Sequence, residues 1–466
     1  MRWIEGMVRH IISGTALLVF LSGCAVQKTP YFKTGYYRSS ISRLDSLKPG
    51  ISYSGDSVFA GFSKVSITPD LNGNLNKKHK GRQNAVPIAG YGQRKTKYAT
   101  GIHDSIFVKA MALRGGQQTV IIVGADMLLM PENIIDSVLF ALSKAGIQRN
   151  SLFFTATHTH SGIGGWGYGL LAKVIAGKEN TGIEKYLTDQ IVKSVLEAIA
   201  DLHPSRLGSG TFNGASYIRN RLTGDPLHNN NDFTYLIVEQ TGQRKAVIGS
   251  FSAHSTTLGR KNTLISGDYP GYWQRKMENS GFDIAMFCGG SMGSQSPVGK
   301  GLEFETARDI GEALADSVAV HIKEVTPGGE LTLSSLSLKI SLPEYHMRLT
   351  SNINLTSGLS KRLMPLPKNV YLQAIQFNNL VWVFTPGDFS AELALTLKKV
   401  MAGKGYQAMV SGYNGSYIGY ILPGKYFYLD YHESKLMGWF GPGMGDYTID
   451  LIERLTDSMI SNNGRE

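Results

Sequence analysis

Two histidines separated by one residue, His158 and His160, end the apolar part of LFFTATHTHSGIGG (152–165), and a glycine-rich turn follows them. Neutral imidazole is the commonest metal ligand, and open α/β sheets place their chemistry at the ends of strands. Alternate side chains of an extended strand share a face, so both imidazoles are expected on one side, about 7 Å apart at their α-carbons. The pair is either the start of a metal site or an ordinary polar strand edge, and a metal site needs more ligands.

Further candidate ligands follow two later apolar runs. His254 ends the strand-like run in AVIGSFSAHSTTLG, although a core histidine bonded to backbone is an equally good interpretation of that segment alone. Asp268 follows in ISGDYPGYW, where its carboxylate could hold the tautomer of a ligating histidine. The run LVWVFTPGDFSAE places Asp388 at the head of a helical pattern, where aspartate is more often an N-cap. Three apolar runs therefore end in a possible metal ligand.

A competing signal for serine chemistry lies in CGGSMGSQSP (288–297). The motif G-x-S-x-G surrounds Ser291 after a predicted strand, as in the nucleophile elbow of a serine esterase, and His346 and His432 are available downstream. The motif leads into a second glycine–serine turn instead of a helix, which argues against an elbow. A structural turn with solvated serines is the third interpretation.

The elements that must position these residues alternate along the chain from about residue 58. Strand-like runs occupy 105–113, 119–129, 152–157, 233–239, 246–253, 283–288, 370–377 and 380–385. Helical patterns occupy 133–145, 184–201, 303–324 and 389–402. KISLP at 339–343 adds to a later β-rich part. This alternation predicts an α/β fold with a mixed, partly parallel sheet and flanking helices, in a single large catalytic domain over residues 56–466.

Composition limits the class of protein. The chain has 466 residues, of which 42% are hydrophobic and 18% charged, so it can bury a large core and is not a disordered tail. Its formal net charge of +11 is spread along the sequence, and the densest basic patch, NKKHKGRQ at 76–83, is interpreted as a solvated loop. No nucleic-acid-binding motif accompanies this charge, so nucleic acid is not an expected partner.

The N-terminus has the features of a targeting segment. It joins a positively charged start to the apolar stretch IISGTALLVFL, which is too short to span a bilayer, and then to LSGC. This pattern predicts a lipoprotein signal peptide over residues 1–24. The sequence LSGC resembles the bacterial lipobox, whose cysteine, here Cys24, becomes the lipidated N-terminus. An ordinary signal peptide is the alternative. Residues 25–55 are predicted to be a polar tether. The expected location is a bacterial membrane on the exported side, and with Cys288 as the only other cysteine no disulfide framework is expected.

The order of the motifs resembles one known family, the neutral, non-lysosomal ceramidases, from about residue 58 to the C-terminus. The motifs are GYG (90–92), GIHD (101–104), ATHTHSGIGG, NR (220–221), FSAHSTTLG, SGDYPGY (266–272), GSQSP (293–297), TPGD (385–388) and SYIGY (416–420). The resemblance implies a zinc-dependent hydrolase that cleaves the amide of N-acylsphingosine (ceramide), or of a related N-acyl lipid, to a fatty acid and a sphingoid base. Family members usually carry a further immunoglobulin-like C-terminal domain, which is expected to be absent from this chain.

The resemblance also implies roles for individual residues. It makes the zinc ligands His158, His254, Asp388 and Tyr420. It assigns acid–base catalysis to His160, stabilisation of the developing oxyanion to Arg221 and Tyr431, and the role of nucleophile or binder of a substrate hydroxyl to Ser296.

Some positions depart from the family pattern. The family has glutamate where Asp388 stands, so the carboxylate is one methylene shorter, and Glu392 on the next helical turn is the alternative ligand. The spacing from Tyr420 to Tyr431 is one residue shorter than in the family, so Tyr428 competes with Tyr431. The family's GDVSPN is replaced by GSQSPV around Ser296.

The chemistry of amide hydrolysis agrees with this set of residues. An amide needs a polarised carbonyl, a nucleophile generated near neutral pH and a proton for the departing amine; zinc provides the first two and a nearby histidine the third. Cationic and hydroxyl donors stabilise the oxyanion. Three hypotheses remain: a zinc amidase, a serine esterase that uses Ser291, and an inactive lipid-binding lipoprotein. Metal content separates the first from the second, and turnover of an N-acyl lipid separates both from the third.

Overall fold

A computed structural model describes residues 29–47, 53–55, 57–71, 86–94, 97–242, 244–301, 303–348 and 354–460. The predicted signal peptide with Cys24 and the basic patch at 76–83 lie outside these ranges. Within them, no helix combines the length and the hydropathy needed to cross a bilayer.

The larger of two sheets has eight strands in the order β12-β10-β9-β7-β2-β4-β5-β6. Its strands are β2 (Val58–Ser66), β4 (Phe107–Gly115), β5 (Gln118–Ala125), β6 (Leu152–Ala156), β7 (His203–Asn213), β9 (Asp232–Gln240), β10 (Lys245–Phe251) and β12 (Ile284–Gly289). The pairs β5–β6 and β10–β12 are parallel and the other pairs are antiparallel. The predicted mixed, partly parallel sheet is therefore confirmed.

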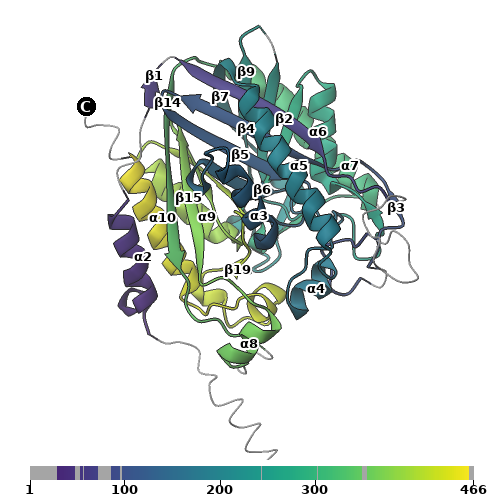
Figure 1. Cartoon of the computed structure of the whole chain (residues 1–466), viewed down its shortest axis with the longest axis vertical. Coiled ribbons are helices and arrows are strands. Elements are labelled where there is room, and N and C mark those ends of the chain that lie inside the picture. Colours follow the sequence, from purple (N-terminus) through teal and green to yellow (C-terminus); the bar gives the residue numbers. More distant parts are fainter. Residues whose placement is uncertain are drawn as a thin grey trace, which may run out of the picture.

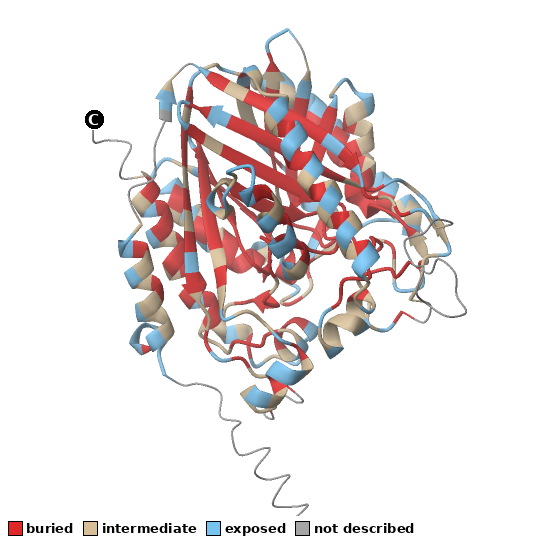
Figure 2. Ribbon diagram, in the orientation of Figure 1, coloured by how far each residue is buried: buried red, intermediate tan, exposed pale blue. Residues whose placement is uncertain are grey.

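A second sheet has five strands in the order β1-β14-β15-β16-β18, with β16 and β18 parallel. Its strands are β1 (Tyr53–Gly55), β14 (Leu331–Ser341), β15 (Asn369–Phe377), β16 (Leu380–Phe384) and β18 (Gln407–Ser411). The two sheets pack face to face through one apolar core, to which the larger sheet contributes Phe62 and Ile122 and the smaller sheet Ile375 and Trp382. Strands of both sheets are mostly buried in Figure 2.

Helices cover the outer faces of both sheets (Figure 1). The helices that pack on the larger sheet are α3 (Glu132–Ser143), α5 (Thr181–Ala200), α6 (Asp268–Asn279) and α7 (Glu303–His321). Those that pack on the smaller sheet are α2 (Gly35–Asp45), α9 (Ala391–Ala402) and α10 (Met444–Ile460). The layers are thus helix, sheet, sheet and helix. Two short helices, α4 (Leu170–Ala176) and α8 (Ser357–Leu363), lie outside these layers at the lower end of Figure 1.

Helix α5 illustrates how local sequence sets these elements. The Asn180 side chain caps its first turn by accepting from the backbone N–H groups of Gly182 and Ile183. One helical stripe is fully buried: Ile183, Leu187, Ile191, Val195 and Ala198. Their spacing of three and four residues puts them on one face, which packs on the larger sheet.

The structure differs from expectation within residues 25–55. Helix α2 lies in this segment; Thr34 caps it, and Leu44 is buried in the core of the smaller sheet. The Ser40 hydroxyl is 2.8 Å from the Tyr447 hydroxyl of α10. Residues 35–45 are thus part of the fold and not a tether, because apolar and hydroxyl side chains on one face of α2 have partners on α10 and β14.

Loops after several strands meet at one end of the sandwich. The backbone N–H of His160 donates to the Ser255 carbonyl at 3.3 Å, which joins the loops after β6 and β10. Three two-stranded ribbons complete this region: β3 (Gly101–Ile102) with β11 (Leu264–Ile265), β8 (Ile218–Asn220) with β13 (Gln295–Pro297), and β17 (Asp388–Phe389) with β19 (Tyr420–Ile421). In the last ribbon Asp388 is the register partner of Tyr420, although 32 residues separate them.

Candidate metal and catalytic site

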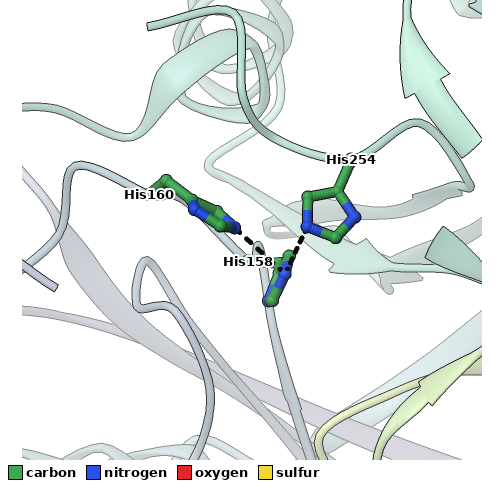
Figure 3. Close-up of side chains that lie close together, drawn as sticks. All are labelled: His158, His160 and His254. Carbon is green, nitrogen blue, oxygen red and sulfur yellow. Dashed lines mark hydrogen bonds between the residues drawn. The ribbon is translucent and has the colours of Figure 1, made fainter. Parts of the chain in front are cut away.

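Three imidazoles converge at this end of the sandwich (Figure 3). His158 Nε2 lies 2.8 Å from His254 Nε2 and 3.3 Å from His160 Nε2. The three candidate ligand nitrogens lie within 4.8 Å of one another, and no other such group of three potential metal-ligating side chains occurs in the described part of the chain. His158 and His254 are buried, and His160 is partly accessible.

A turn, not a strand, aims the two neighbouring histidines. Strand β6 ends at Ala156, and His158 has φ of 59°, in the left-handed region that non-glycine residues rarely adopt. The expected strand alternation for His158 and His160 is therefore wrong. Two contacts of the His158 side chain hold it in place despite the unusual backbone: the Tyr413 ring stacks on one face of the imidazole at 4.3 Å, and Nδ1 lies 2.5 Å from the Leu128 carbonyl oxygen.

The hydrogen bonds behind two of the rings favour one tautomer. Nδ1 of His158 faces the Leu128 carbonyl, and Nδ1 of His254 lies 3.2 Å from the Met292 carbonyl oxygen. Where Nδ1 donates to its carbonyl, Nε2 keeps its lone pair, the arrangement usual for ligating histidines. Arg221 Nη2, which can only donate, also lies 3.3 Å from His254 Nδ1, so His254 has this tautomer when its Nδ1 bonds Met292 and not Arg221. Burial lowers the pKa of all three imidazoles, so the rings are neutral near pH 7. Lone pairs at 2.8 Å repel unless a cation lies between them, so the donor set fits a metal ion.

A carboxylate lies beside the histidines. Asp388 Oδ1 is 3.7 Å from His158 Nε2. The Tyr413 hydroxyl donates to Oδ1 and the Tyr417 hydroxyl to Oδ2, each at 2.6 Å. Burial, followed by the Asp388 charge, raises the pKa of both phenols, so both stay protonated as donors. We call Tyr413 and Tyr417 the tyrosine clamp.

The alternative carboxylate, Glu392, has other partners. Its Oε1 accepts from the Asn220 side chain at 2.8 Å, and its Oε2 accepts from the Ser294 hydroxyl at 2.9 Å. Glu392 thus fixes the β8–β13 ribbon to the start of α9. The geometry favours Asp388 over Glu392 as the carboxylate next to the histidines.

An arginine and a tyrosine close another side of the site. Arg221 Nη2 donates to the Tyr420 hydroxyl at 3.1 Å and lies 3.3 Å from His254 Nδ1. Arg221 Nε lies 2.6 Å from Glu433 Oε1, an ion pair that sets the direction of the guanidinium. Burial and the Asp388 charge raise the pKa of Tyr420, while Arg221 favours its ionised form. The ring of Tyr420 lies parallel to that of His254 at 6.5 Å.

Ser296 and Tyr431 are less closely tied to the histidines. Ser296 pairs with Arg219 in the β8–β13 ribbon, two residues before Arg221, and its side chain is partly accessible. Tyr431 is 46% exposed and its competitor Tyr428 is 54% exposed. Among the described contacts, no hydrogen bond or ring contact joins Ser296, Tyr431 or Tyr428 to the three imidazoles.

The serine-esterase pattern does not form an elbow. Ser291 is completely buried; its Oγ accepts from the Asn230 side chain at 2.9 Å and lies 3.0 Å from Ser252 Oγ. A nucleophile needs an exposed hydroxyl and a base, and Ser291 contacts no histidine within the described ranges. Nδ1 of His346, a possible partner, faces the Leu355 carbonyl at 3.0 Å.

Asp268 holds a loop and not a histidine. Its carboxylate accepts from the Thr257 hydroxyl and from the backbone N–H groups of Leu258 and Tyr269, so it fixes the loop after His254. The expectation that Asp268 fixes a histidine tautomer is therefore wrong, since the Met292 carbonyl occupies that place for His254.

Sequence reasoning missed several residues of the site: Tyr91, Arg94, Tyr413, Tyr417 and Glu433. The Tyr91 ring packs 4.7 Å from the His160 ring, and Arg94 donates to the His160 carbonyl at 2.6 Å. The two clamp tyrosines lie in SGYNGSYIGY just before Tyr420, so the tyrosine density of that stretch was the available signal.

Comparison with known proteins identifies relatives of this chain. The family model of the neutral/alkaline non-lysosomal ceramidases, N-terminal part, matches residues 77–301. The neutral ceramidase of Mycobacterium tuberculosis (strain ATCC 25618 / H37Rv) is 27% identical over 281 residues, which are 52% of this chain and 44% of that protein. The neutral ceramidase of Pseudomonas aeruginosa is 29% identical over 258 residues, which are 48% of this chain and 38% of that protein. This chain thus matches less than half the length of each curated relative.

Two solved structures share the fold. The crystal structure of neutral ceramidase from Pseudomonas aeruginosa aligns with a TM-score of 0.73 at 21% identity and covers 87% of this chain and 75% of that chain. A ceramidase complexed with C2 aligns with a TM-score of 0.74 at 19% identity and the same coverage. The family match includes His158, Arg221 and His254. Over residues 77–301, therefore, the family match and the curated relatives support a relationship of this chain to the neutral/alkaline non-lysosomal ceramidase family.

Proposed function

We propose that this chain is a zinc-dependent amidohydrolase that cleaves the amide of ceramide, or of a related N-acyl lipid, to a fatty acid and a sphingoid base. The observation that carries the proposal is the convergence of three neutral imidazoles beside the buried carboxylate of Asp388. The names of the curated relatives support the substrate class. The buried, fully bonded Ser291 speaks against the serine-esterase alternative.

The proposed zinc ligands are His158, His254, Asp388 and Tyr420. Nitrogen and oxygen donors in a compact, largely buried group suit zinc. His160 differs from the proposed ligands because its Nδ1 is buried and has no hydrogen-bond partner among the described residues. A ring whose tautomer is not fixed from behind is better suited to proton transfer than to ligation.

In the proposed mechanism, bound zinc provides Lewis-acid chemistry toward the amide carbonyl and toward water. His160 takes a proton from the attacking water at Nε2 and delivers it to the departing amine. Arg221 stabilises the negative oxygen that develops from the carbonyl, and its ion pair with Glu433 holds the guanidinium in place. Tyr431, which is 46% exposed and follows Tyr420 in the same segment, is the proposed second donor to this oxygen.

Ser296 is proposed to bind a polar group of the substrate. It lies on the same ribbon as Arg221 but has no base in hydrogen-bond contact among the described residues, so water is the better nucleophile. The Ser296 hydroxyl is partly accessible and can donate to a substrate hydroxyl.

We also propose that the protein is exported and anchored to a bacterial membrane through a lipid on Cys24. The support is the sequence pattern alone, a charged start, an apolar stretch and LSGC.

Ceramide hydrolysis by purified protein tests the proposed function. The wild type should release fatty acid, lose activity when a chelator removes its metal, and regain activity when zinc is added back. His158→Ala should be inactive under all conditions. His321→Ala is the matched control, because His321 also bonds a backbone carbonyl, that of Ser317, but lies at the end of α7 and contacts none of the three histidines in the described part of the chain. Undiminished activity of verified metal-free protein would exclude the proposed mechanism.

A further inference from the structure

Two neighbouring cavities lie on the surface where the N-terminal described segment meets two loops of the C-terminal part. Their volumes are about 470 and 830 Å³. Both are lined by Thr29, Tyr36, Phe440 and Gly441, so they form one hollowed region. We call the surface made by residues 29–36, 423–428 and 440–443 the aromatic face.

The aromatic face exposes large apolar side chains on a rigid base. Phe32 is 53% exposed and Tyr428 is 54% exposed, and both line the larger cavity. The Tyr31 ring packs edge-on to Phe32 at 5.6 Å, and the Tyr36 ring packs edge-on to Tyr447 of α10 at 5.1 Å. Helices α2 and α10 lie side by side in Figure 1, so the cluster is fixed to the fold. Exposed aromatic side chains on a rigid surface are typical of a contact with the interfacial region of a bilayer.

The chain upstream of Thr29 indicates what covers this face. Only residues 25–28 separate Cys24 from Thr29, and five extended residues reach no more than about 18 Å. A domain of this length is roughly 50 Å across, so a lipid on Cys24 can bring only the surface around Thr29 to the membrane. That surface is the aromatic face. Lys425 and Asp446 line the larger cavity and Glu344 and Arg348 line the smaller one, so the charges of each cavity balance and apolar contact is the expected attraction.

The aromatic face is continuous with the candidate site. The segment that supplies Tyr428 begins at Tyr420, a proposed ligand, and continues through Tyr431 and Leu436, which are 46% and 48% exposed. Between these two, the His432 ring packs edge-on to the Tyr420 ring at 6.4 Å. A bilayer that touches Tyr428 would therefore present its lipids near the rim of the site.

We infer that the aromatic face is the surface through which this protein lies on a lipid bilayer, with the rim of the candidate site turned toward the substrate lipid. The inference rests on the proposed anchor and on the proposed function. It names the bilayer itself as the partner and gives the protein one orientation on it.

Spin labels on the full, Cys24-containing chain test the orientation in phosphatidylcholine vesicles. Labels are placed by Phe32→Cys and Tyr428→Cys, with Phe140→Cys on α3 as the control, because Phe140 is 68% exposed and α3 covers the other sheet. Cys288 is buried and should not react. On addition of vesicles, labels at 32 and 428 should become more accessible to oxygen than to a water-soluble nickel complex, while the control should not change. Labels at 32 and 428 that remain as water-exposed as the control, or a chain that does not bind vesicles, would overturn the inference.

A second measurement separates failure of the surface from failure of the enzyme. Phe32→Ser should lower hydrolysis of ceramide in vesicles by about fivefold to tenfold, the scale expected when an aromatic side chain no longer enters the interface. Hydrolysis of a water-soluble short-chain N-acyl substrate and the zinc content should be unchanged, and Phe140→Ser should behave as wild type on both substrates. Equal activity of Phe32→Ser and wild type on vesicles would contradict the inference, whereas a wild type inactive on both substrates would contradict the proposed function.

Discussion

The tyrosine clamp on Asp388 gives the sharpest quantitative prediction. The Tyr417 hydroxyl donates to Asp388 Oδ2 at 2.6 Å, and Tyr413 donates to the other oxygen at the same distance. Each carboxylate oxygen of Asp388 accepts from one of these two hydroxyls, so the orientation of the carboxylate depends on both donors. Tyr417→Phe removes one donor and leaves the ring in place.

The expected magnitude follows from the hydrogen bond that is lost. A hydrogen bond to a charged group contributes about 1.5–3 kcal/mol, and removal of an outer partner of a metal ligand weakens metal binding by about 10- to 100-fold. The hydrogen bond from Tyr417 to Asp388 is part of the fold itself, so part of the loss should appear as a lower free energy of unfolding. We therefore expect zinc affinity to fall by about tenfold, at the lower end of that range.

Competition with a chelator of known affinity measures this change. The matched control is Tyr447→Phe, which also removes a buried hydroxyl: Tyr447 lies 2.8 Å from Ser40 Oγ and donates to the Ser341 carbonyl at 2.7 Å, far from the histidines in the fold. The control should lose stability and keep its zinc affinity. Wild-type zinc affinity in Tyr417→Phe, or an equal loss in both variants, would refute the role of the clamp.

Three other predictions follow from the same contacts. Asp388→Asn should lose zinc while Glu392→Gln keeps it, as measured by zinc content. The reverse result would show that the carboxylate ligand is Glu392, one helical turn further along the chain. Ser296→Ala should lower kcat/KM for ceramide by on the order of 10²-fold with zinc retained, whereas Ser291→Ala should keep its activity and lose about 1 kcal/mol of stability in urea unfolding. Burial lowers the pKa of the three histidines, so below about pH 6.5 the unfolded chain binds protons that the metal-free folded protein does not bind. The free energy of unfolding of metal-free protein should therefore fall as the pH drops through that value. A free energy of unfolding that does not change with pH in this range would contradict the assignment.

The sequence predicted the residue types of the site better than their geometry. His158, His254 and Asp388 follow apolar runs, and strand ends meet in α/β folds, so their convergence could be anticipated. The left-handed backbone of His158 could not, because no local pattern marks a non-glycine residue with positive φ. The choice between Asp388 and Glu392 depended on the partners of each side chain, which helical spacing does not specify.

The fold was predicted in class but not in its layers. Long apolar runs such as β5 and β9 were identified because both their faces are buried. Helix α6 was not among the predicted helices, because its first turn, Asp268 to Gly271, contains proline and glycine, which are typical of turns. Proline is nevertheless tolerated in the first turn of a helix, where its missing N–H costs no hydrogen bond. The packing of two sheets on each other was also missed, because the periodicity of a strand does not specify its neighbours.

Zinc content after metal reconstitution tests the central claim most directly. Protein is loaded with zinc, dialysed free of unbound metal and measured by elemental analysis beside His158→Ala, His254→Ala and the control His321→Ala. Wild type and control should retain one zinc ion per chain, and the two site variants should retain close to none. A wild type that binds no zinc, or site variants that bind as much as the control, would contradict a metal site at the three histidines.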